Sequence, residues 1–279
     1  MTAQFATNTV TFGGSLADKL QATRQAGFAG IELWAEDLEG FPGGPREAAK
    51  LIADSGLEIY DLQVLRDFEA QSEMRRSTVR AQAEHYFDLM EMIGAKTLLT
   101  CAAVREDSLD DPVRAASDLA ELGDLAHRRA LRIGFEALAW SRWTNTIDAA
   151  WRLVRAANRA NVGLVVDTFH IQALNTPLQR VAEIPIERVA LVQIADAHMV
   201  PGLPTIEIAR HHRVFPGEGD LAVAELVRLL RESGYAGRWS LEIFNDGYRA
   251  EPANVVARRA MQSLERLFAK TAPRLAEAL

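Results

Sequence analysis

The stretch Val162-Gly-Leu-Val-Val-Asp167 is an apolar run of strand length that ends on an acid. Continuous apolar runs of this length are typical of strands buried on both faces. An acid at the end of such a strand loses much of its hydration, which is costly unless a cation or hydrogen-bond donors replace the water. Asp167 is therefore a candidate ligand for a cation.

Three more short apolar runs between residues 132 and 242 end on an oxygen-bearing polar residue. They are Arg132-Ile-Gly-Phe-Glu136, Val189-Ala-Leu-Val-Gln193 and Trp239-Ser-Leu-Glu242. The two-residue period of a strand lets each terminal side chain point into a barrel. Taken singly, each could be a strand-end group wetted at the barrel rim. Four such groups at equivalent ends of successive strands indicate a site instead.

Strand-like and helix-like patterns alternate along the whole chain, which predicts an α/β protein with a (β/α)8 TIM barrel. The strand candidates are Phe5–Val10, Gly30–Trp34, Leu57–Leu62, Thr97–Cys101, Arg132–Glu136, Val162–Asp167, Val189–Ile194 and Trp239–Ile243. The amphipathic helix candidates are Ser15–Ala26, Pro45–Ser55, Met74–Ile93, Asp111–Ala130, Thr144–Ala160, Leu178–Ile184, Leu221–Ser233 and Pro252–Ala269.

Helix-start and helix-stop residues support this pattern. Ser15 and Asp111-Pro112 are suited to begin helices, and Gly27 and Gly94 to follow their ends. No linker divides the sequence, so we expect one metal-dependent barrel domain over residues 1–279 and no second domain after it. Two segments, Gly40–Pro45 and Pro201–Asp220, are expected to be long loops over the catalytic face.

Composition excludes several classes of partner. The 279 residues are 48% hydrophobic and 25% charged, with a net charge of −7, so contact with nucleic acid or an anionic membrane surface is disfavoured. The single cysteine, Cys101, rules out an internal disulfide framework, and we expect a buried structural thiol. The start of the sequence lacks a secretory pattern, so we expect a cytoplasmic protein.

The donor set indicates which metal is bound. Three carboxylates and one amide oxygen, without thiolate or imidazole, favour Mg²⁺ or Mn²⁺, with Co²⁺ as an alternative. An anionic substrate would need nearby cations, and Arg66 and the cluster Arg210-His-His-Arg213 could supply them. For Arg66, a local ion pair with Asp67 or Glu69 is the alternative.

His170 follows Asp167 by three residues and is expected on the loop that leaves this strand. It could remove a proton from the substrate, or only hydrogen-bond a metal ligand. The aromatic residues at or just after strand ends, Trp34, Trp140, Trp143 and Phe244, could wall a substrate pocket or pack in the core.

Several motifs carry a resemblance to a known family. The whole chain resembles the xylose isomerase-like barrels of the sugar phosphate isomerase/epimerase superfamily and, within them, bacterial 3-dehydroshikimate dehydratases. Most isomerases of this superfamily have His where this chain has Gln193. The similar stretches are Arg66-Asp-Phe-Glu69, Phe135-Glu-Ala-Leu-Ala-Trp140, Asp167-Thr-Phe-His170, Val192-Gln-Ile-Ala-Asp-Ala197, Arg210-His-His-Arg-Val-Phe-Pro-Gly-Glu-Gly219 and Ser240-Leu-Glu-Ile-Phe-Asn-Asp-Gly247.

The resemblance implies a lyase that dehydrates 3-dehydroshikimate, a small hydroxy-keto acid, to protocatechuate in quinate and shikimate catabolism. It implies that His170 is the base. The implied metal ligands are Glu136, Asp167, Gln193 and Glu242, and the implied substrate-binding residues are Arg66, Glu69, Arg210 and His211.

Other functions stay open. A sugar or sugar-phosphate isomerase or epimerase would use the same ligand set, and a barrel that senses a ligand without catalysis is a third reading. A multi-zinc endonuclease of the superfamily would need more histidines and a basic surface. A homo-oligomer is compatible with the sequence, but nothing in it fixes a symmetry.

Overall fold

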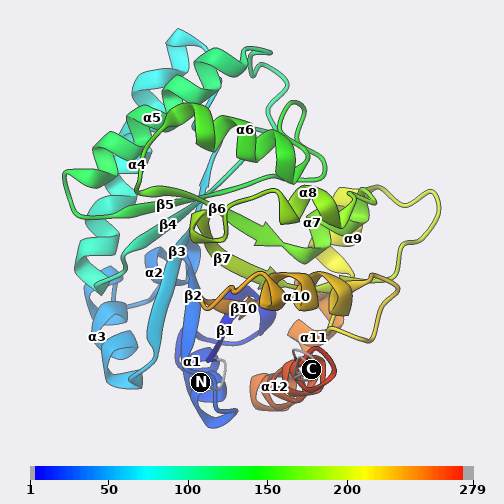
Figure 1. Ribbon diagram of the computed structural model, residues 1–279. Coiled ribbons are helices and arrows are strands. Elements are labelled where there is room, and N and C mark those ends of the chain that lie inside the picture. The colour runs from blue at the N-terminus through cyan, green and yellow to red at the C-terminus, as the bar shows by residue number, and fades with distance from the viewer. Residues whose placement is uncertain (1–3, 273–279) are drawn as a thin grey trace.

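The computed structural model describes residues 4–272, and at its centre lie eight parallel strands closed into a barrel (Figure 1). Their order around the barrel is β1-β10-β7-β6-β5-β4-β3-β2. The α/β TIM barrel predicted from the sequence is confirmed. The barrel strands are β1 (Phe5–Asn8), β2 (Gly30–Trp34), β3 (Glu58–Arg66), β4 (Thr97–Cys101), β5 (Arg132–Glu136), β6 (Val162–Asp167), β7 (Val189–Ile194) and β10 (Trp239–Leu241).

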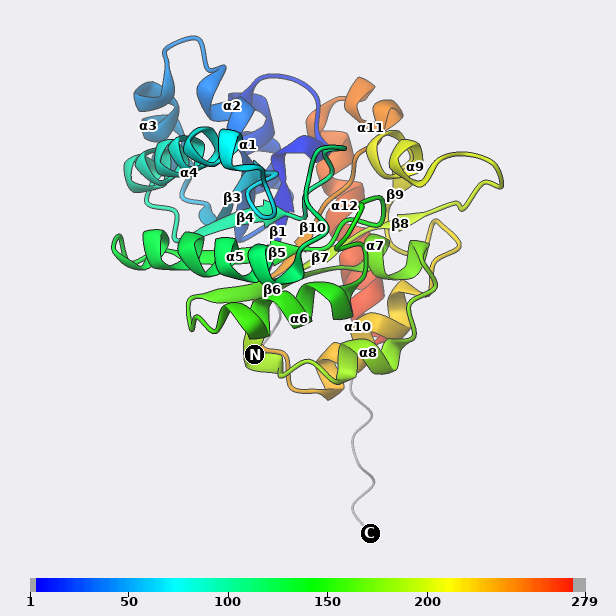
Figure 2. The same cartoon turned by 90° about the horizontal axis from the view of Figure 1, so that it is seen from above.

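Helices surround the barrel, as the view from above shows (Figure 2). They are α1 (Leu16–Gln25), α2 (Ala35–Glu39), α3 (Pro45–Ser55), α4 (Glu73–Ile93), α5 (Pro112–His127), α6 (Ile147–Ala157), α7 (Thr168–Ala173), α8 (Leu178–Ala182), α9 (Thr205–His211), α10 (Val223–Glu232), α11 (Asp246–Ala250) and α12 (Ala253–Lys270). Among the described residues, none of these helices is long and apolar enough to cross a membrane.

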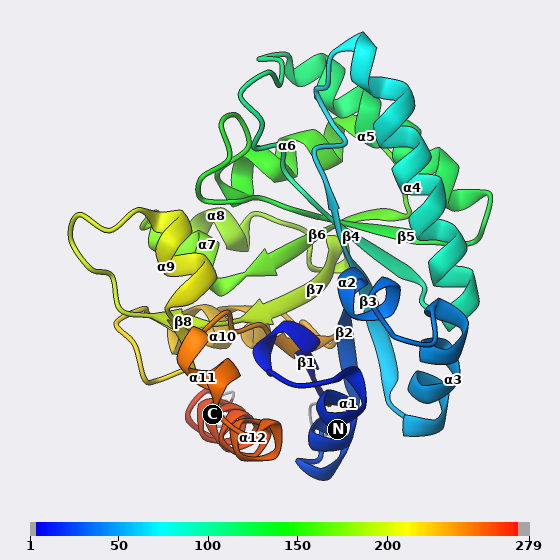
Figure 3. The same ribbon diagram turned by 180° about the vertical axis from the view of Figure 1, so that it is seen from behind.

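Pairing between the first and last strands closes the barrel. Phe5 lies opposite Trp239 in the β1–β10 register, and helices α1 and α12 from the two ends of the chain lie side by side (Figure 3). This closure matters for the site, because it brings polar residues of the first strands next to those of the last strands.

Five predicted strands have the observed bounds, and three differ. Strand β1 stops at Asn8 because Thr9–Thr11 form a 3-10 turn, which Asn8 caps by accepting from the Val10 N–H. Strand β3 continues to Arg66, four residues beyond its predicted end. Strand β10 ends at Leu241, so Glu242 follows the strand instead of lying within it.

The main helices lie within three residues of their predicted bounds, and the predicted caps are present. Ser15 and Asp18 form a reciprocal capping box at α1, and the Asp111 side chain accepts from the Arg114 N–H at α5. Gly94 ends α4 in the left-handed region. The single-domain prediction also covers residues 1–3 and 273–279, which lie outside the described part of the chain.

Short elements in the loops were not predicted. His170 lies in helix α7 and not on a loop, and Pro201–Asp220 contains α9 and the short strand β9 (Arg213–Val214). Strand β9 pairs antiparallel with β8 (Asp196–Ala197), away from the barrel strands. The unpredicted helices α2, α7, α9 and α11 have five to seven residues and span less than two turns, so their sequences contain too few positions to establish a helical period.

Candidate metal centre

The four residues predicted as metal ligands come together at the carboxyl end of the barrel. Glu136 and Asp167 are the last residues of β5 and β6, Gln193 is the next-to-last residue of β7, and Glu242 follows β10. In the strand register Gln193 lies opposite Asp167 on one side and Ser240 on the other. All four side chains are buried. They are therefore not solvent-exposed groups at the barrel rim, which was the alternative for each of them.

Two of the four side chains present an oxygen that has no hydrogen-bond partner among residues 4–272. These atoms are Glu136 Oε1 and Gln193 Oε1, and both are shielded from water. Buried polar atoms normally have a partner, because leaving one unpaired costs about 1–3 kcal/mol. A hard cation bound by oxygen would supply that partner, so the residues fit a divalent metal.

The carboxylates crowd one another, which changes their protonation. Burial, followed by repulsion from Glu242 and Asp167, raises the pKa of Glu136 well above its usual value. Burial also raises the pKa of Glu242 to about 8, against the opposing charge of Arg213. A bound dication would offset this repulsion and favour the ionised carboxylates.

Arg213 is the cation that the protein itself places among these acids. Its guanidinium is buried, and Nη1 donates to Asp167 Oδ2 at 2.8 Å and to Glu242 Oε2 at 3.1 Å. Burial raises the pKa of Asp167, but the charge of Arg213 together with the other neighbouring groups outweighs burial and lowers the pKa overall. The sequence identifies Arg213 only as one member of the cluster Arg210-His-His-Arg213. The pairing of β8 with β9 is what brings it inside, while Arg210 stays exposed.

His170 lies beside the same acids. Its Nε2 is 3.6 Å from Glu136 Oε1 and 3.5 Å from Asp167 Oδ2, while its Nδ1 accepts from the Ala139 N–H at 3.2 Å. Burial lowers the pKa of His170 to about 4, so the ring is neutral near pH 7.

The donor atoms of His170, Glu136 and Asp167 all lie within 4.8 Å of one another. These three could therefore hold a metal ion as well, which gives His170 a third role that the sequence did not suggest.

A second layer of polar residues lies behind Gln193. Its Nε2 donates to Glu32 Oε2 at 2.7 Å, and Gln63 Nε2 donates to the same oxygen at 3.0 Å. Asp61 lies beside Glu32, and burial raises the pKa of both acids, that of Asp61 to about 7. Sequence reasoning missed these residues, although charged residues inside the apolar strands Gly30–Trp34 and Leu57–Leu62 were a visible signal.

Above the acids opens a pocket of about 340 Å³. The Arg66 guanidinium lies 5.2 Å from the centre of the Trp34 ring. Within residues 4–272 no ion pair joins Arg66 to Asp67 or Glu69, so the local-pair alternative is not present. His211 faces Asp246, with 2.9 Å between Nδ1 and Oδ2. The residues of this pocket include Trp34, Arg66, Trp140, His170, Arg210, His211, Arg213, Glu242 and Phe244.

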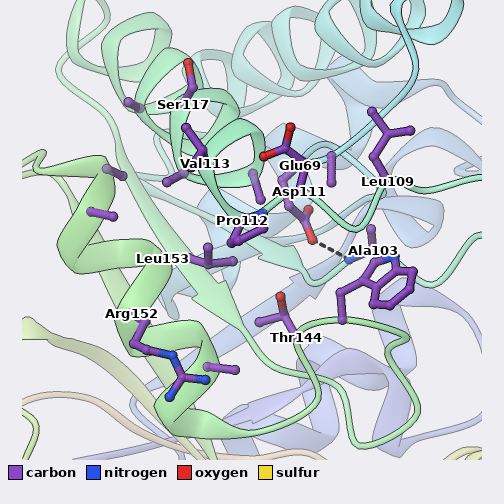
Figure 4. Close-up of a pocket in the computed structure, with 18 of the residues that line it drawn as sticks. Glu69, Ala103, Leu109, Asp111, Pro112, Val113, Ser117, Thr144, Arg152 and Leu153 are labelled. Carbon is purple, nitrogen blue, oxygen red and sulfur yellow. Dashed lines mark hydrogen bonds between the residues drawn. The ribbon is translucent and has the colours of Figure 1, made fainter.

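Glu69 is not brought to this pocket. It lines a separate pocket of about 940 Å³ beside α5 and α6, where its Oε1 accepts from the Ala103 N–H at 2.5 Å (Figure 4). Its Oε2 has no partner among the described residues, and burial raises the pKa of Glu69 to about 8. Its predicted role in substrate binding therefore has no support from this geometry.

Comparisons with known proteins agree with the architecture. Residues 20–267 match the family described as xylose isomerase-like TIM barrel. The chain is 43% identical over 263 residues to a 3-dehydroshikimate dehydratase of Pseudomonas aeruginosa, covering 94% of this chain and 41% of the relative. It is 39% identical to a 3-dehydroshikimate dehydratase of Pseudomonas putida, covering 96% of this chain and 42% of that relative.

A solved structure is also closely similar. It is a xylose isomerase-like TIM barrel/4-hydroxyphenylpyruvate dioxygenase fusion protein, with a TM-score of 0.94 and 38% identity, covering 99% of this chain and 44% of that one. The chain thus spans less than half the length of these three proteins. With the barrel, the strand-end acids and the matched residues in agreement, the chain belongs to the family of xylose isomerase-like TIM barrels.

Proposed function

We propose that the protein dehydrates 3-dehydroshikimate to protocatechuate with the help of one divalent metal ion. The observation that carries the proposal is 39–43% identity, over nearly the whole chain, to relatives named 3-dehydroshikimate dehydratase. The buried oxygen donors at the strand ends are consistent with it. The enzyme would be a carbon–oxygen lyase acting on a small hydroxy-keto acid.

Glu136, Asp167, Gln193 and Glu242 would hold the metal, with Mg²⁺ or Mn²⁺ as first choice and Co²⁺ as the alternative. A bound dication would supply Lewis acidity toward the substrate ketone, which acidifies the neighbouring C–H. The two unpartnered oxygens, Glu136 Oε1 and Gln193 Oε1, support this set.

His170 would take the proton from that carbon. Its position next to Glu136 and Asp167, in the wall of the pocket, supports this role. The hydroxyl on the following carbon then leaves as water, and loss of a further proton makes the ring aromatic. Aromatic stabilisation makes the reaction effectively one-way.

Arginine would bind the substrate carboxylate, because three acids at the site repel an unpaired anion. Arg66 is the first choice and Arg210 the second, and both line the pocket together with His211. Trp34, Trp140 and Phe244 would wall the ring of the substrate. A cytoplasmic location and a homo-oligomeric state remain parts of the proposal.

The test is turnover by purified protein. Protein stripped with chelator and reloaded with Mg²⁺, Mn²⁺ or Co²⁺ is mixed with 3-dehydroshikimate, and protocatechuate is followed by its aromatic absorbance. We expect product from the loaded protein and none from the stripped protein. A ketose panel run alongside tests the isomerase alternative. Turnover of ketoses without protocatechuate would replace the proposal, and binding without turnover would favour a ligand-sensing barrel.

A further inference from the structure

The amide of Gln193 is held by its surroundings in one orientation. Its Nε2 donates to two different carboxyl oxygens, Glu32 Oε2 at 2.7 Å and Glu242 Oε1 at 3.1 Å. An amide nitrogen has two hydrogens, so both are used. The amide oxygen is therefore turned away from Glu32 and has no partner among the described residues.

The orientation of this amide decides whether Gln193 can bind a metal, because only the oxygen of an amide is a ligand for hard cations. Rotating the amide by 180° would place Oε1 against Glu32 and Glu242. With a dication bound and both carboxylates ionised, an acceptor would then face two acceptors in a buried site, and each carboxylate would lose its donor.

Glu32 is well placed to enforce this orientation. Gln63 on the neighbouring strand β3 donates to the same Oε2 at 3.0 Å, which fixes the carboxyl group of Glu32 on β2. Glu242 is less able to do so, because it is itself a proposed ligand and its other carboxyl oxygen accepts from Arg213. We propose that Glu32 is a positioning residue that fixes the Gln193 amide so that its oxygen faces the metal.

This inference rests on the proposed metal site, and its test is metal affinity instead of activity. Mn²⁺ binding to the purified chain is measured by titration calorimetry for wild type, Glu32→Asp, Glu32→Gln and Gln193→Ala. Glu32→Asp keeps the charge but withdraws the acceptor from Gln193. Glu32→Gln removes the charge but keeps an oxygen that can accept from Gln193 and Gln63. Its new N–H₂ would face Asp61, whose side-chain oxygens have no hydrogen-bond partner among residues 4–272.

We expect Glu32→Asp to weaken Mn²⁺ binding by about 10-fold or more, the usual scale for residues that orient metal ligands. Glu32→Gln should stay within a few-fold of wild type. The opposite order, with a loss in Glu32→Gln and none in Glu32→Asp, would mean that Glu32 acts through its charge and would overturn the proposal.

The double variant Glu32→Asp/Gln193→Ala tests whether the effect passes through Gln193. If Glu32 only positions that amide, Glu32→Asp should weaken binding less than about two-fold when the amide is already absent. An equal loss in both backgrounds would overturn the proposal and indicate a general effect on the barrel.

Two controls distinguish a failure of this proposal from loss of the fold or absence of the proposed metal site. Exposed Glu265→Gln on α12 should bind Mn²⁺ like wild type, and thermal unfolding of each metal-free variant reports whether the fold is kept. A wild-type chain that binds none of Mg²⁺, Mn²⁺ and Co²⁺ would overturn the metal site itself. Unchanged affinity in Gln193→Ala with intact wild-type binding would overturn only the role of Gln193 and Glu32.

Discussion

Each oxygen of Glu242 has a defined neighbour, so this residue shows how the site is balanced at the scale of single groups. Oε1 accepts from Asn8 and Gln193, and Oε2 accepts from Arg213. Asn8 and Gln193 are neutral, whereas Arg213 is shared with Asp167. The acids of the site therefore outnumber its buried cation, and a dication would favour their ionised forms.

Replacing Glu242 by Gln keeps the size of the side chain and removes one ligand charge. We expect affinity for Mn²⁺ or Mg²⁺ to fall by at least about 10-fold, with a parallel loss of turnover, because a ligand should matter no less than a group that orients one. Calorimetry measures the affinity, and exposed Glu265→Gln is the matched control. Full activity of the variant after chelation would contradict the prediction.

Replacing His170 by Asn tests the base. If His170 removes the proton, turnover should fall by about 10²-fold or more while metal content stays unchanged. Metal analysis of the purified variant makes the distinction, with exposed His127→Asn as the control. Loss of metal together with activity would instead assign His170 to the ligand set with Glu136 and Asp167. Unchanged turnover would leave it a hydrogen-bonding neighbour.

Replacing Arg66 by Lys tests recognition of the substrate carboxylate. A lysine keeps the charge but cannot donate two parallel hydrogen bonds, so KM for 3-dehydroshikimate should rise strongly while the fold is unchanged. Steady-state kinetics measure this, and exposed Arg266→Lys on α12 serves as control. If kinetics with 3-dehydroshikimate are unaffected and an uncharged ketose is a good substrate, both the assignment and the dehydratase proposal should be abandoned.

At the scale of elements, the pairing of the strands places the ligand candidates, and hydrogen bonds at the helix ends differ from helix to helix. The register that sets Gln193 between Asp167 and Ser240 follows from parallel pairing of β6, β7 and β10. Helices α1 and α4 both begin after a serine, but the two serines differ in their hydrogen bonds. Ser15 caps α1 through its side chain, whereas Ser72 precedes α4 without a side-chain cap bond.

This pair gives a prediction with an internal control. Ser15→Ala removes a capping hydrogen bond and should lower the free energy of unfolding by about 1 kcal/mol. Ser72→Ala removes no such bond and should change it much less. Urea unfolding of the two variants measures both values, and kcat should be unchanged in each because neither residue lines the metal centre. Equal losses would show that the capping box contributes nothing specific.

At the scale of the whole molecule, buried acids couple stability to pH. Burial raises the pKa of Glu69 to about 8 in the folded chain, whereas an unfolded glutamate titrates near 4.3. Between these values the folded state retains a proton that the unfolded state has lost. The contribution is therefore fully present below about pH 4 and is lost as pH rises to about 8.

Glu69→Gln mimics the protonated acid at every pH and should remove this dependence. Relative to wild type, the variant should gain stability between pH 5 and pH 8.5, by at least about 1 kcal/mol, the equivalent of one pKa unit. Urea unfolding of metal-free protein at the two pH values measures the difference, and Glu265→Gln should show none. Turnover of 3-dehydroshikimate by Glu69→Gln also tests the predicted role of Glu69 in substrate binding. If Glu69 binds the substrate, this variant should have a raised KM.

The sequence by itself determined the strands, the main helices, their caps and the four strand-end ligand candidates, because these depend on local periodicity and on residue type. Tertiary structure alone decided which distant groups meet them. Asn8 reaches Glu242 across 234 positions and Glu32 reaches Gln193 across 161, because β1 pairs with β10 and closes the barrel. Arg213 lies in the site because it belongs to the two-residue strand β9, and Glu69 lines a different pocket. Closure of the barrel over long sequence distances and short irregular segments produce no hydrophobic periodicity. Local sequence patterns therefore cannot predict them.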